Sequence, residues 1–266
     1  MSRRIGFVAL VAVFGTLVFP AWGATDDRPA GEAREIVLAM IAAHGGMEKW
    51  KAAPTVSFED RVFVGEGKPG VPSRVTVEQG PRRAYIDFPG TEMRLAWDGE
   101  RAWSENWDSP YPPRFLAQLN YYFLNLPWLT IDPGVNLESQ GTGRLWDDPV
   151  EYQLVKMTFD AGVGDTPDDY YILYIDPESH FLKANKYTVT YSSILTEGQK
   201  STPEHILIYE EFADVGGLRV PTRYTIYDTD RQVLMKCDVS DWSFSRPFDL
   251  TRMTMPEGAT VNNSSY

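Results

Sequence analysis

Few side chains in this sequence have the type and spacing that metal or acid–base chemistry needs. The histidines are His44, His180 and His205, and Cys237 is the only cysteine. None of them has the spacing of a zinc site, and the acidic runs lack the alternating ligands of a calcium loop. We therefore expect no metal and no cofactor, and we expect His44 to lie at the C-terminal end of a helix.

Covalent and phosphate chemistry also lack their usual signatures. The chain has no GxSxG motif, no Walker loop and no dinucleotide-binding glycine pattern. Paired carboxylates meet in space rather than in sequence, so a carboxylate-based hydrolase stays open as a minor alternative. We name no catalytic residue and predict a protein that is not an enzyme.

Aromatic side chains give the strongest signal for a binding site. Between residues 97 and 128 they gather around an apolar segment: Trp97, Trp103, Trp107, Tyr121, Tyr122, Phe123 and Trp128. Ligand pockets are mostly apolar and lined by aromatic rings, although ordinary core packing produces the same pattern. The residues that we predict to bind an apolar ligand are Met40, Trp97, Trp103, Tyr122, Phe123, Trp128 and Tyr187.

Two apolar helices are predicted to position these side chains. Apolar residues recur at helical spacing over Glu32–His44, and Gly45-Gly46 should end that helix. A second helix is predicted over Pro112–Pro127, with proline at its start and proline at its end.

Most of the remaining chain alternates between apolar and polar residues, which is typical of strands joined by short turns. Clear examples are 150–159, 170–175, 182–191, 206–212, 220–227 and 233–242. A sheet of this size must curl or split. The predicted fold class is therefore mainly β (α+β), a curled antiparallel half-barrel of about ten or eleven strands with helices over the concave face.

Two residues of the predicted strands differ from their neighbours. On one side of the segment from Val56 to Val64, Asp60 alone breaks the apolar series. Cys237 lies in an alternating strand, has no second cysteine to pair with, and is predicted to be buried and unreactive.

Charge and length exclude several classes of partner. The 266 residues carry 25 Lys+Arg against 37 Asp+Glu, a formal net charge of −12. Nucleic acids and anionic bilayers carry charge of the same sign, so we expect neither as a partner. No internal linker marks a second domain, and we predict one domain over residues 24–266.

The N-terminal segment has the pattern of a secretory signal peptide. Arg3 and Arg4 precede the apolar run Ile5–Phe19, and the small residues Ala21 and Gly23 follow it. That run is shorter than a bilayer span of about 20 residues, and no later stretch is long enough to cross a membrane. We expect residues 1–23 to be cleaved near Gly23, which predicts a periplasmic or secreted protein. An uncleaved anchor is the alternative.

Several strings, in this order, resemble one family. They are 43–46 (AHGG) with Trp50 after it, 97–103 (WDGERAW), 171–178 (YILYIDPE) with 181–183 (FLK), and 212–222 (FADVGGLRVPT). Over most of residues 32–242 the chain resembles the superfamily of outer-membrane lipoprotein carriers (LolA/LolB-like) and related periplasmic lipid-handling proteins. The resemblance implies a curled half-barrel with helices over its concave side, binding of acyl chains or another apolar ligand, and no catalysis or cofactor.

Two functional hypotheses follow. In the first, the protein binds a lipid, a lipoprotein acyl chain or another apolar ligand in a groove between helices and sheet. In the second, it is a non-catalytic interaction or sensor domain of the same fold, with the groove filled by its own core. A continuous apolar cavity of roughly several hundred Å³ would favour the first.

Overall fold

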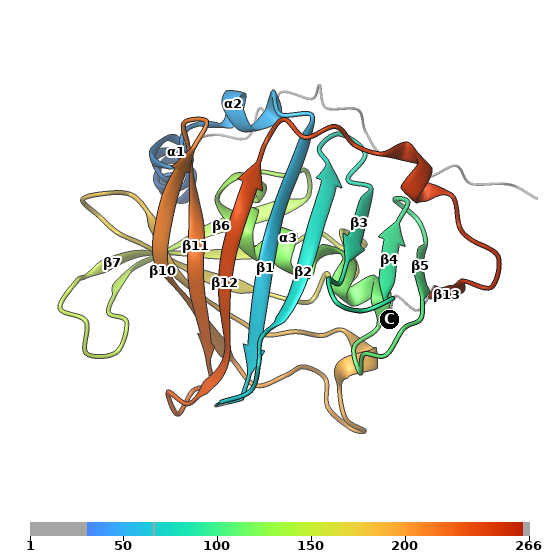
Figure 1. Cartoon of the computed structure of the whole chain (residues 1–266). Helices are drawn as coiled ribbons and strands as arrows, with labels where there is room; N and C mark the ends of the chain where they lie inside the picture. The colour runs from blue at the N-terminus through green and yellow to red at the C-terminus, as the bar shows by residue number, and fades with distance from the viewer. Residues whose placement is uncertain (1–30, 66, 263–266) are drawn as a thin grey trace, which may run out of the picture. The chain divides into compact units, whose positions relative to one another are not determined.

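An antiparallel sheet of 13 strands makes up most of the described chain (Figure 1). The structure is a computed structural model that describes residues 31–65 and 67–262, within a unit that begins at Gly31. The predicted signal peptide lies outside the described residues. The strands are β1 (Thr55–Val64), β2 (Val71–Glu78), β3 (Ala84–Asp87), β4 (Arg94–Trp97), β5 (Ala102–Glu105), β6 (Val135–Gly143), β7 (Tyr152–Phe159), β8 (Tyr171–Ile175), β9 (Leu182–Tyr187), β10 (His205–Val215), β11 (Leu218–Tyr227), β12 (Val233–Ser243) and β13 (Thr260–Asn262).

The strands form two meanders that meet in the middle of the sheet. The order is β13-β5-β4-β3-β2-β1-β12-β11-β10-β9-β8-β7-β6. Strands β1 to β5 follow one another outward from the centre, and β6 to β12 return from the opposite edge. The ladder between β1 and β12 joins the two runs, with Asp60 opposite Val239 and Val62 opposite Cys237.

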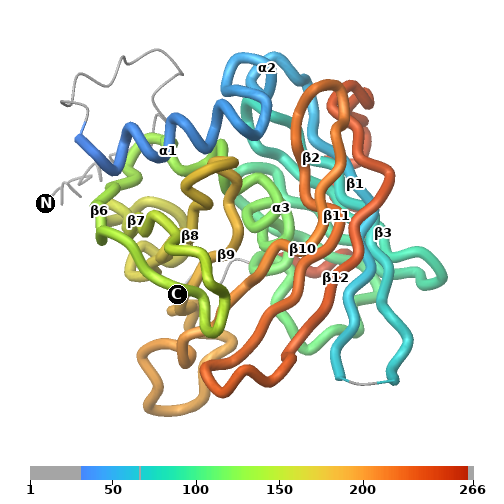
Figure 2. The backbone as a smooth tube through the Cα atoms, turned by 90° about the vertical axis from the view of Figure 1, so that its left-hand side faces the viewer, coloured from blue at the N-terminus to red at the C-terminus, as the bar shows by residue number. Residues whose placement is uncertain are grey.

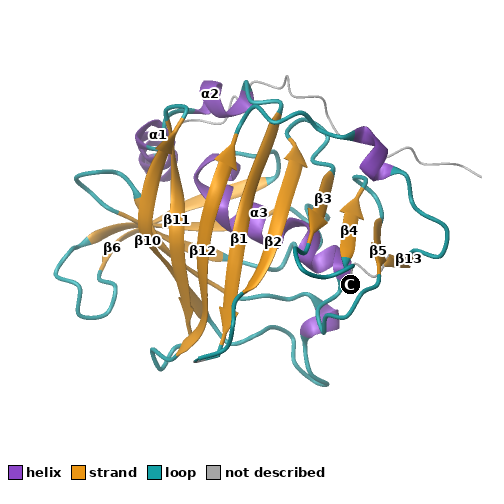
Figure 3. Ribbon diagram, in the orientation of Figure 1, coloured by secondary structure: helices purple, strands orange, loops and turns teal. Residues whose placement is uncertain are grey.

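Helices cover one side of this curled, unclosed sheet (Figure 3). They are α1 (Glu32–Ala43), α2 (Met47–Lys51) and α3 (Pro113–Leu129), and two 3₁₀ turns, η1 (Ser192–Ile194) and η2 (Leu250–Met253), lie in loops. Figure 2 shows α3 between β8 and β9 on one side and β11 and β12 on the other, so that it occupies the concave face. The predicted fold class, a half-barrel with helices on its concave side, is confirmed.

The close fit of α1 against a hairpin explains the glycine pair that ends it. Gly45 has a φ of 103°, which favours glycine. A side chain at Gly45 would place its Cβ 2.3 Å from the carbonyl oxygen of Gly217, in the β10–β11 turn. The predicted end of the first helix at Gly45-Gly46 is confirmed.

The main hydrophobic core lies between the helices and the concave face, and two smaller clusters lie apart from it. One contains Leu145 and Tyr152 beside β9 and β10, and the other contains Tyr85 and Trp103 beside the C-terminal segment. Both faces of the sheet are therefore partly covered. No helix among the described residues is long and apolar enough to cross a membrane.

The sheet has more strands than the ten or eleven that we predicted, because the two edge strands lack an apolar pattern. Strand β6 has the polar sequence VNLESQGTG and pairs only with β7, while β13 is three residues long and pairs only with β5. An edge strand buries little surface on either side, so its sequence need not alternate.

Candidate functional site

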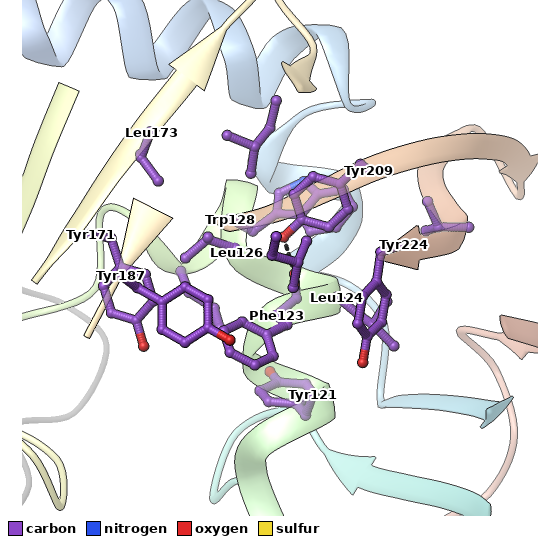
Figure 4. Close-up of a cluster of buried hydrophobic side chains, with 14 of the residues drawn as sticks. Tyr121, Phe123, Leu124, Leu126, Trp128, Tyr171, Leu173, Tyr187, Tyr209 and Tyr224 are labelled. Carbon is purple, nitrogen blue, oxygen red and sulfur yellow. Dashed lines mark hydrogen bonds between the residues drawn. The ribbon is translucent and has the colours of Figure 1, made fainter. Parts of the chain in front are cut away.

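Helix α3 passes through a proline that we predicted would end it, and that prediction is wrong. The helix continues past Pro127 to Leu129. Proline has no N–H, so the carbonyl oxygen of Phe123, four residues earlier, loses its helical donor. The Tyr209 hydroxyl of β10 donates to that oxygen at 2.5 Å, which satisfies it and joins the helix to the sheet (Figure 4).

This contact predicts the effect of a single substitution. Tyr209→Phe keeps the ring but leaves the Phe123 carbonyl oxygen buried without a donor, so we expect the free energy of unfolding to fall by about 1–3 kcal/mol. Urea denaturation of both proteins measures it. Tyr174→Phe, which changes a partly buried ring packed against the separate cluster of Leu145 and Tyr152, is the control. Equal stability of wild type and Tyr209→Phe would show that the carbonyl has another donor.

Most of the predicted binding residues belong to the main core, and three of them lie on α3 itself. Six of the seven pack in the main core or against it: Met40, Trp97, Tyr122, Phe123, Trp128 and Tyr187. The ring of Phe123 lies 5.0 Å from that of Tyr187 (Figure 4). The ring of Tyr122 lies 5.6 Å from that of Tyr171.

The structure does not bring Trp103 to this site. Trp103 packs with Tyr85 and Ala96 in the separate cluster near Phe248 and Met253. The residue before it, Ala102, is opposite Trp97 in the ladder, and successive strand residues point to opposite faces. Our prediction for Trp103 was therefore wrong, because closeness in sequence to the other aromatic residues does not show which face of the strand a side chain is on.

A layer of aromatic rings closes the C-terminal end of α3. Trp128 is 0% exposed, its ring stacks on Trp50 with centroids 5.8 Å apart, and it makes a T-shaped contact with His44 with centroids 5.9 Å apart. His44 is the C-cap residue of α1, as expected, but its ring also joins two strands. Nδ1 donates to the Arg219 carbonyl oxygen at 2.8 Å, and Nε2 accepts from the Leu182 N–H at 3.2 Å.

These two hydrogen bonds require a neutral imidazole. Burial lowers the pKa of His44 from 6.5 to about 4, and the bond to the Arg219 carbonyl opposes that change. Protonation would turn Nε2 into a donor that faces the Leu182 N–H. His44 is thus a structural residue at the junction of α1, β9 and β11.

Polar side chains hold the middle of α3 to the sheet. Asp60 of β1 is 3% exposed and accepts from the Ser73 hydroxyl at 2.5 Å and from the Asn120 amide of α3. The Tyr224 hydroxyl donates to the Asn120 oxygen at 3.1 Å. Burial raises the pKa of Asp60 to about 6, against the effect of its hydrogen bonds. In the sequence, Asp60 is visible only as a break in the apolar series, and we predicted no role for it.

Two ion pairs hold the ends of the same helix. Arg114, in its first turn, lies 2.6 Å from Asp165 and stacks over the ring of Trp97 at 4.6 Å. Beyond its C-terminus, Asp132 lies 2.5 Å from Arg82 of the β2–β3 connection. Helix α3 is therefore held to the sheet and its loops along its whole length.

Some polar atoms at the contact between α3 and the sheet have no partner. In the described part of the chain, the hydroxyl of Tyr122, the indole N–H of Trp128 and the amide oxygen of Asn185 are buried without a hydrogen bond. Buried polar groups nearly always have partners, because each unpaired group costs about 1–3 kcal/mol. The contact is consequently not fully matched.

The space between α3 and the sheet is filled by side chains. A gap lined by His44, Leu124, Tyr209 and Phe212 admits no water-sized volume. A depression of about 300 Å³ lies elsewhere, between the loop after β6 and the β11–β12 turn, and is lined by Trp146, Lys183, Ile208, Arg231 and neighbours. No cavity for an acyl chain is open at the gap under α3 in this conformation.

Cys237 lies on the concave face, next to Asp60 and Tyr224. It is 0% exposed, which confirms the predicted burial, and burial raises the pKa of its thiol far above the usual range. Across residues 31–65 and 67–262, no group of three His, Cys, Asp or Glu side chains gathers to hold a metal ion.

We expect the thiol of Cys237 to resist labelling in the folded protein. A thiol reagent should react at least about a hundredfold more slowly without denaturant than with it, because the nucleophile is the thiolate and burial disfavours it. The absorbance of the coloured thiolate that a disulfide reagent releases measures the labelling rate. Rapid labelling under native conditions would show that β12 or α3 opens readily.

Comparison with known proteins supports the fold and leaves the ligand open. No family model and no curated protein matches the chain. A LolA superfamily protein from Nitrosomonas europaea matches at 12% identity and a TM-score of 0.54, over 84% of this chain and 97% of that one. A DUF1329 family protein from Desulfovibrio piger matches at 10% and 0.53, over 82% and 95%.

A third solved structure, a putative outer membrane lipoprotein-sorting protein domain from Vibrio parahaemolyticus, matches at 7% identity and a TM-score of 0.51. This match covers 82% of the present chain and 94% of the Vibrio chain. The chain thus has a LolA/LolB-like fold, as the sequence resemblance predicted. At such low identity the likeness shows the fold alone.

Proposed function

We propose that this protein binds the acyl chain of a lipid or lipoprotein, or a similar apolar molecule, on the concave face of the sheet beneath α3. The observation that carries the proposal is the incomplete match between α3 and the sheet. Tyr122, Trp128 and Asn185 each keep a buried polar atom unpaired at this contact, which lowers the free energy needed to exchange the helix for another apolar partner.

The physical driving force would be exchange of one apolar partner for another. Each methylene group that leaves water contributes about 0.8 kcal/mol. The ligand must displace the side chains of α3, so its affinity is reduced by the stability of the closed form. Binding then requires the polar contacts of Asn120, Arg82 and Arg114 with the sheet and loops to break or rearrange.

The choice of lipid rests on the fold and on the N-terminal segment. The Vibrio structure is described as a lipoprotein-sorting domain, and the predicted signal peptide would export this chain to a compartment that faces membranes. We propose a periplasmic or secreted carrier or receptor of such ligands, with Met40, Trp97, Tyr122, Phe123, Trp128 and Tyr187 in contact with the apolar chain.

The second candidate is a non-catalytic interaction or sensor domain with a permanently filled core. The absence of water-sized space in the gap beside His44 and Tyr209 favours it. The two candidates differ in one measurable property, which is whether α3 leaves the concave face when an apolar molecule is present.

A neutral solvatochromic dye tests the proposal. Nile red should bind the delipidated, folded protein and be displaced by phospholipid. Asn120→Ala removes the amide that joins α3 to Asp60 and Tyr224, so it should raise dye affinity about five- to thirtyfold by weakening the closed form. Asn136→Ala, which removes an exposed amide on edge strand β6, should leave the affinity unchanged. Fluorescence titration measures both.

Two results would contradict lipid binding. One is a folded protein that binds neither dye nor lipid, with or without the Asn120 substitution. The other is native mass spectrometry and solvent extraction of the protein, purified from its own compartment, that find no bound apolar molecule. Either result leaves the interaction domain as the better account.

A further inference from the structure

Asp60 is a carboxylate on an otherwise apolar part of the concave face. Its neighbours on the same side of β1 are Phe58, which is fully buried, and Val62, which packs against the core. In the ladders, Asp60 lies opposite Ser73 of β2 and Val239 of β12. An unpaired charge at such a position is costly and serves no packing purpose.

The groups around Asp60 are polar but uncharged. Its two side-chain donors are the Ser73 hydroxyl and the Asn120 amide, and the Tyr224 hydroxyl and the Cys237 thiol lie next to them. Among the ion pairs of residues 31–65 and 67–262, none includes Asp60. The carboxylate is therefore an acceptor that forms no ion pair with a cation of these residues.

Only one of its donors belongs to the helix that we propose to move. Ser73 stays with the sheet, whereas Asn120 leaves with α3. When α3 is displaced, Asp60 loses a hydrogen bond and faces the apolar chain that has taken the place of the helix. A donor on the ligand would replace the lost amide, and an acceptor there would face an unneutralised carboxylate.

Asp60 is also close to the C-terminal end of β1, where the concave face becomes exposed to solvent. Moving outward along the same side, Val62 is half-buried and Val64 is 51% exposed, while Val71, opposite Val62 on β2, is 52% exposed. These residues continue the apolar lining of the concave face into solvent. A ligand that approaches over them reaches Asp60 before it reaches the aromatic core.

The other charged groups near α3 do not offer an alternative anchor for an anion. The Arg82 guanidinium is paired with Asp132, and Arg114 is paired with Asp165. The further buried carboxyl near the ring cluster, Asp169, is an acid and accepts from Thr190. Of these charged groups in the described chain, both arginines already have a carboxylate partner, whereas Asp60 and Asp169 accept only from uncharged donors.

From this placement, and resting on the proposed function, we infer that the ligand carries a hydrogen-bond donor next to its apolar chain. An ammonium, hydroxyl or amide N–H takes the place of the Asn120 amide at Asp60. Chains that end in a carboxylate are disfavoured at the same position. Asp60 is a specificity-determining residue for the ligand head group.

A set of probes with one chain length tests the inference. Dodecylamine, dodecanol and dodecanoate each compete with Nile red for the wild-type protein, for Asp60→Asn and for Glu59→Gln. Glu59 is the adjacent residue on the opposite face of β1, where it pairs with Arg74, so its substitution removes the same charge from the exterior.

In the wild type and in Glu59→Gln, the amine and the alcohol should displace the dye at concentrations at least about tenfold lower than dodecanoate, the size of one hydrogen bond to a charged group. In Asp60→Asn the difference should fall below about threefold. If the dye binds but dodecanoate competes equally well in the wild type, or if Asp60→Asn keeps the preference, the inference fails and the proposed function stands. If the folded wild type binds no dye, both fail.

Discussion

Trp128→Ala is expected to lower the free energy of unfolding by about 3–5 kcal/mol, the range for truncating a large buried aromatic residue. The Trp128 side chain is fully buried, stacks on Trp50 and makes a T-shaped contact with His44. Alanine leaves a cavity beside Trp50 of α2 and His44 at the end of α1. Urea denaturation followed by circular dichroism measures the change.

A less buried tryptophan is the matched control. Trp146 lies on the outer side of β10 and β11, where it contacts Tyr227 and Arg231, and Trp146→Ala should reduce stability by much less. A loss below about 1 kcal/mol for Trp128→Ala would mean that the C-terminal turn of α3 is not packed as described. Because the stability effect is large, ligand binding at this position is better tested with Trp128→Phe.

Asp60→Asn is expected to raise the free energy of unfolding by roughly 2–3 kcal/mol at pH 8. Burial raises the pKa of Asp60 from its usual 3.8 to about 6, and each unit corresponds to about 1.4 kcal/mol. Since the folded pKa is higher than the unfolded one, Asp60 stabilises the fold fully below about pH 4. That contribution is lost as the pH rises through 6.

The substituted amide can keep the hydrogen bonds. The Ser73 hydroxyl still donates to its oxygen, and the Asn120 amide turns over so that its own oxygen accepts from the new N–H. The gain in stability should therefore shrink towards zero at pH 4, and Glu59→Gln should show no such pH dependence. Urea denaturation at pH 4, 6 and 8 tests this, and a destabilised Asp60→Asn at pH 8 would contradict it.

His44 is expected to contribute to stability with the opposite dependence on pH. Its pKa is lower in the folded state, so protons bind preferentially to the unfolded chain as the pH falls from 6.5 towards 4. Comparing wild type with Asp60→Asn at each pH cancels the contribution of His44 to the free energy of unfolding, because both proteins contain His44.

Sequence patterns were sufficient to predict the fold class. Six of the seven residues that they singled out pack in the main core or against it. Helical spacing located α1 and α3, and alternation located the long strands, because each buries one continuous apolar face. The same reasoning placed Pro127 at the end of α3. It failed there because a distant hydroxyl, that of Tyr209, replaces the missing donor, and no local pattern contains that contact.

The limits of the sequence are clearest at Trp103 and Asp60. Trp103 is close in sequence to Trp97, but it packs with Tyr85 and Ala96, apart from the main core. Asp60 was visible as an interruption, yet its meaning depends on Asn120, which faces it from the helix. Whether an acidic residue is solvated or buried is decided by tertiary contacts, and these cannot be derived from local spacing.

The β1–β12 ladder also constrains how the protein folds. Strand β1 is translated early. One of its two neighbours in the sheet is β12, the last long strand, and Val62 of β1 is paired with Cys237 of β12. Contacts so distant in sequence form slowly, because a long loop must close before they contribute. Until β12 is made, β1 has an unpaired edge, and the two meanders have no hydrogen-bonded ladder between them. We therefore expect a chain that is still emerging from the ribosome to complete the centre of its sheet only after β12 has been made.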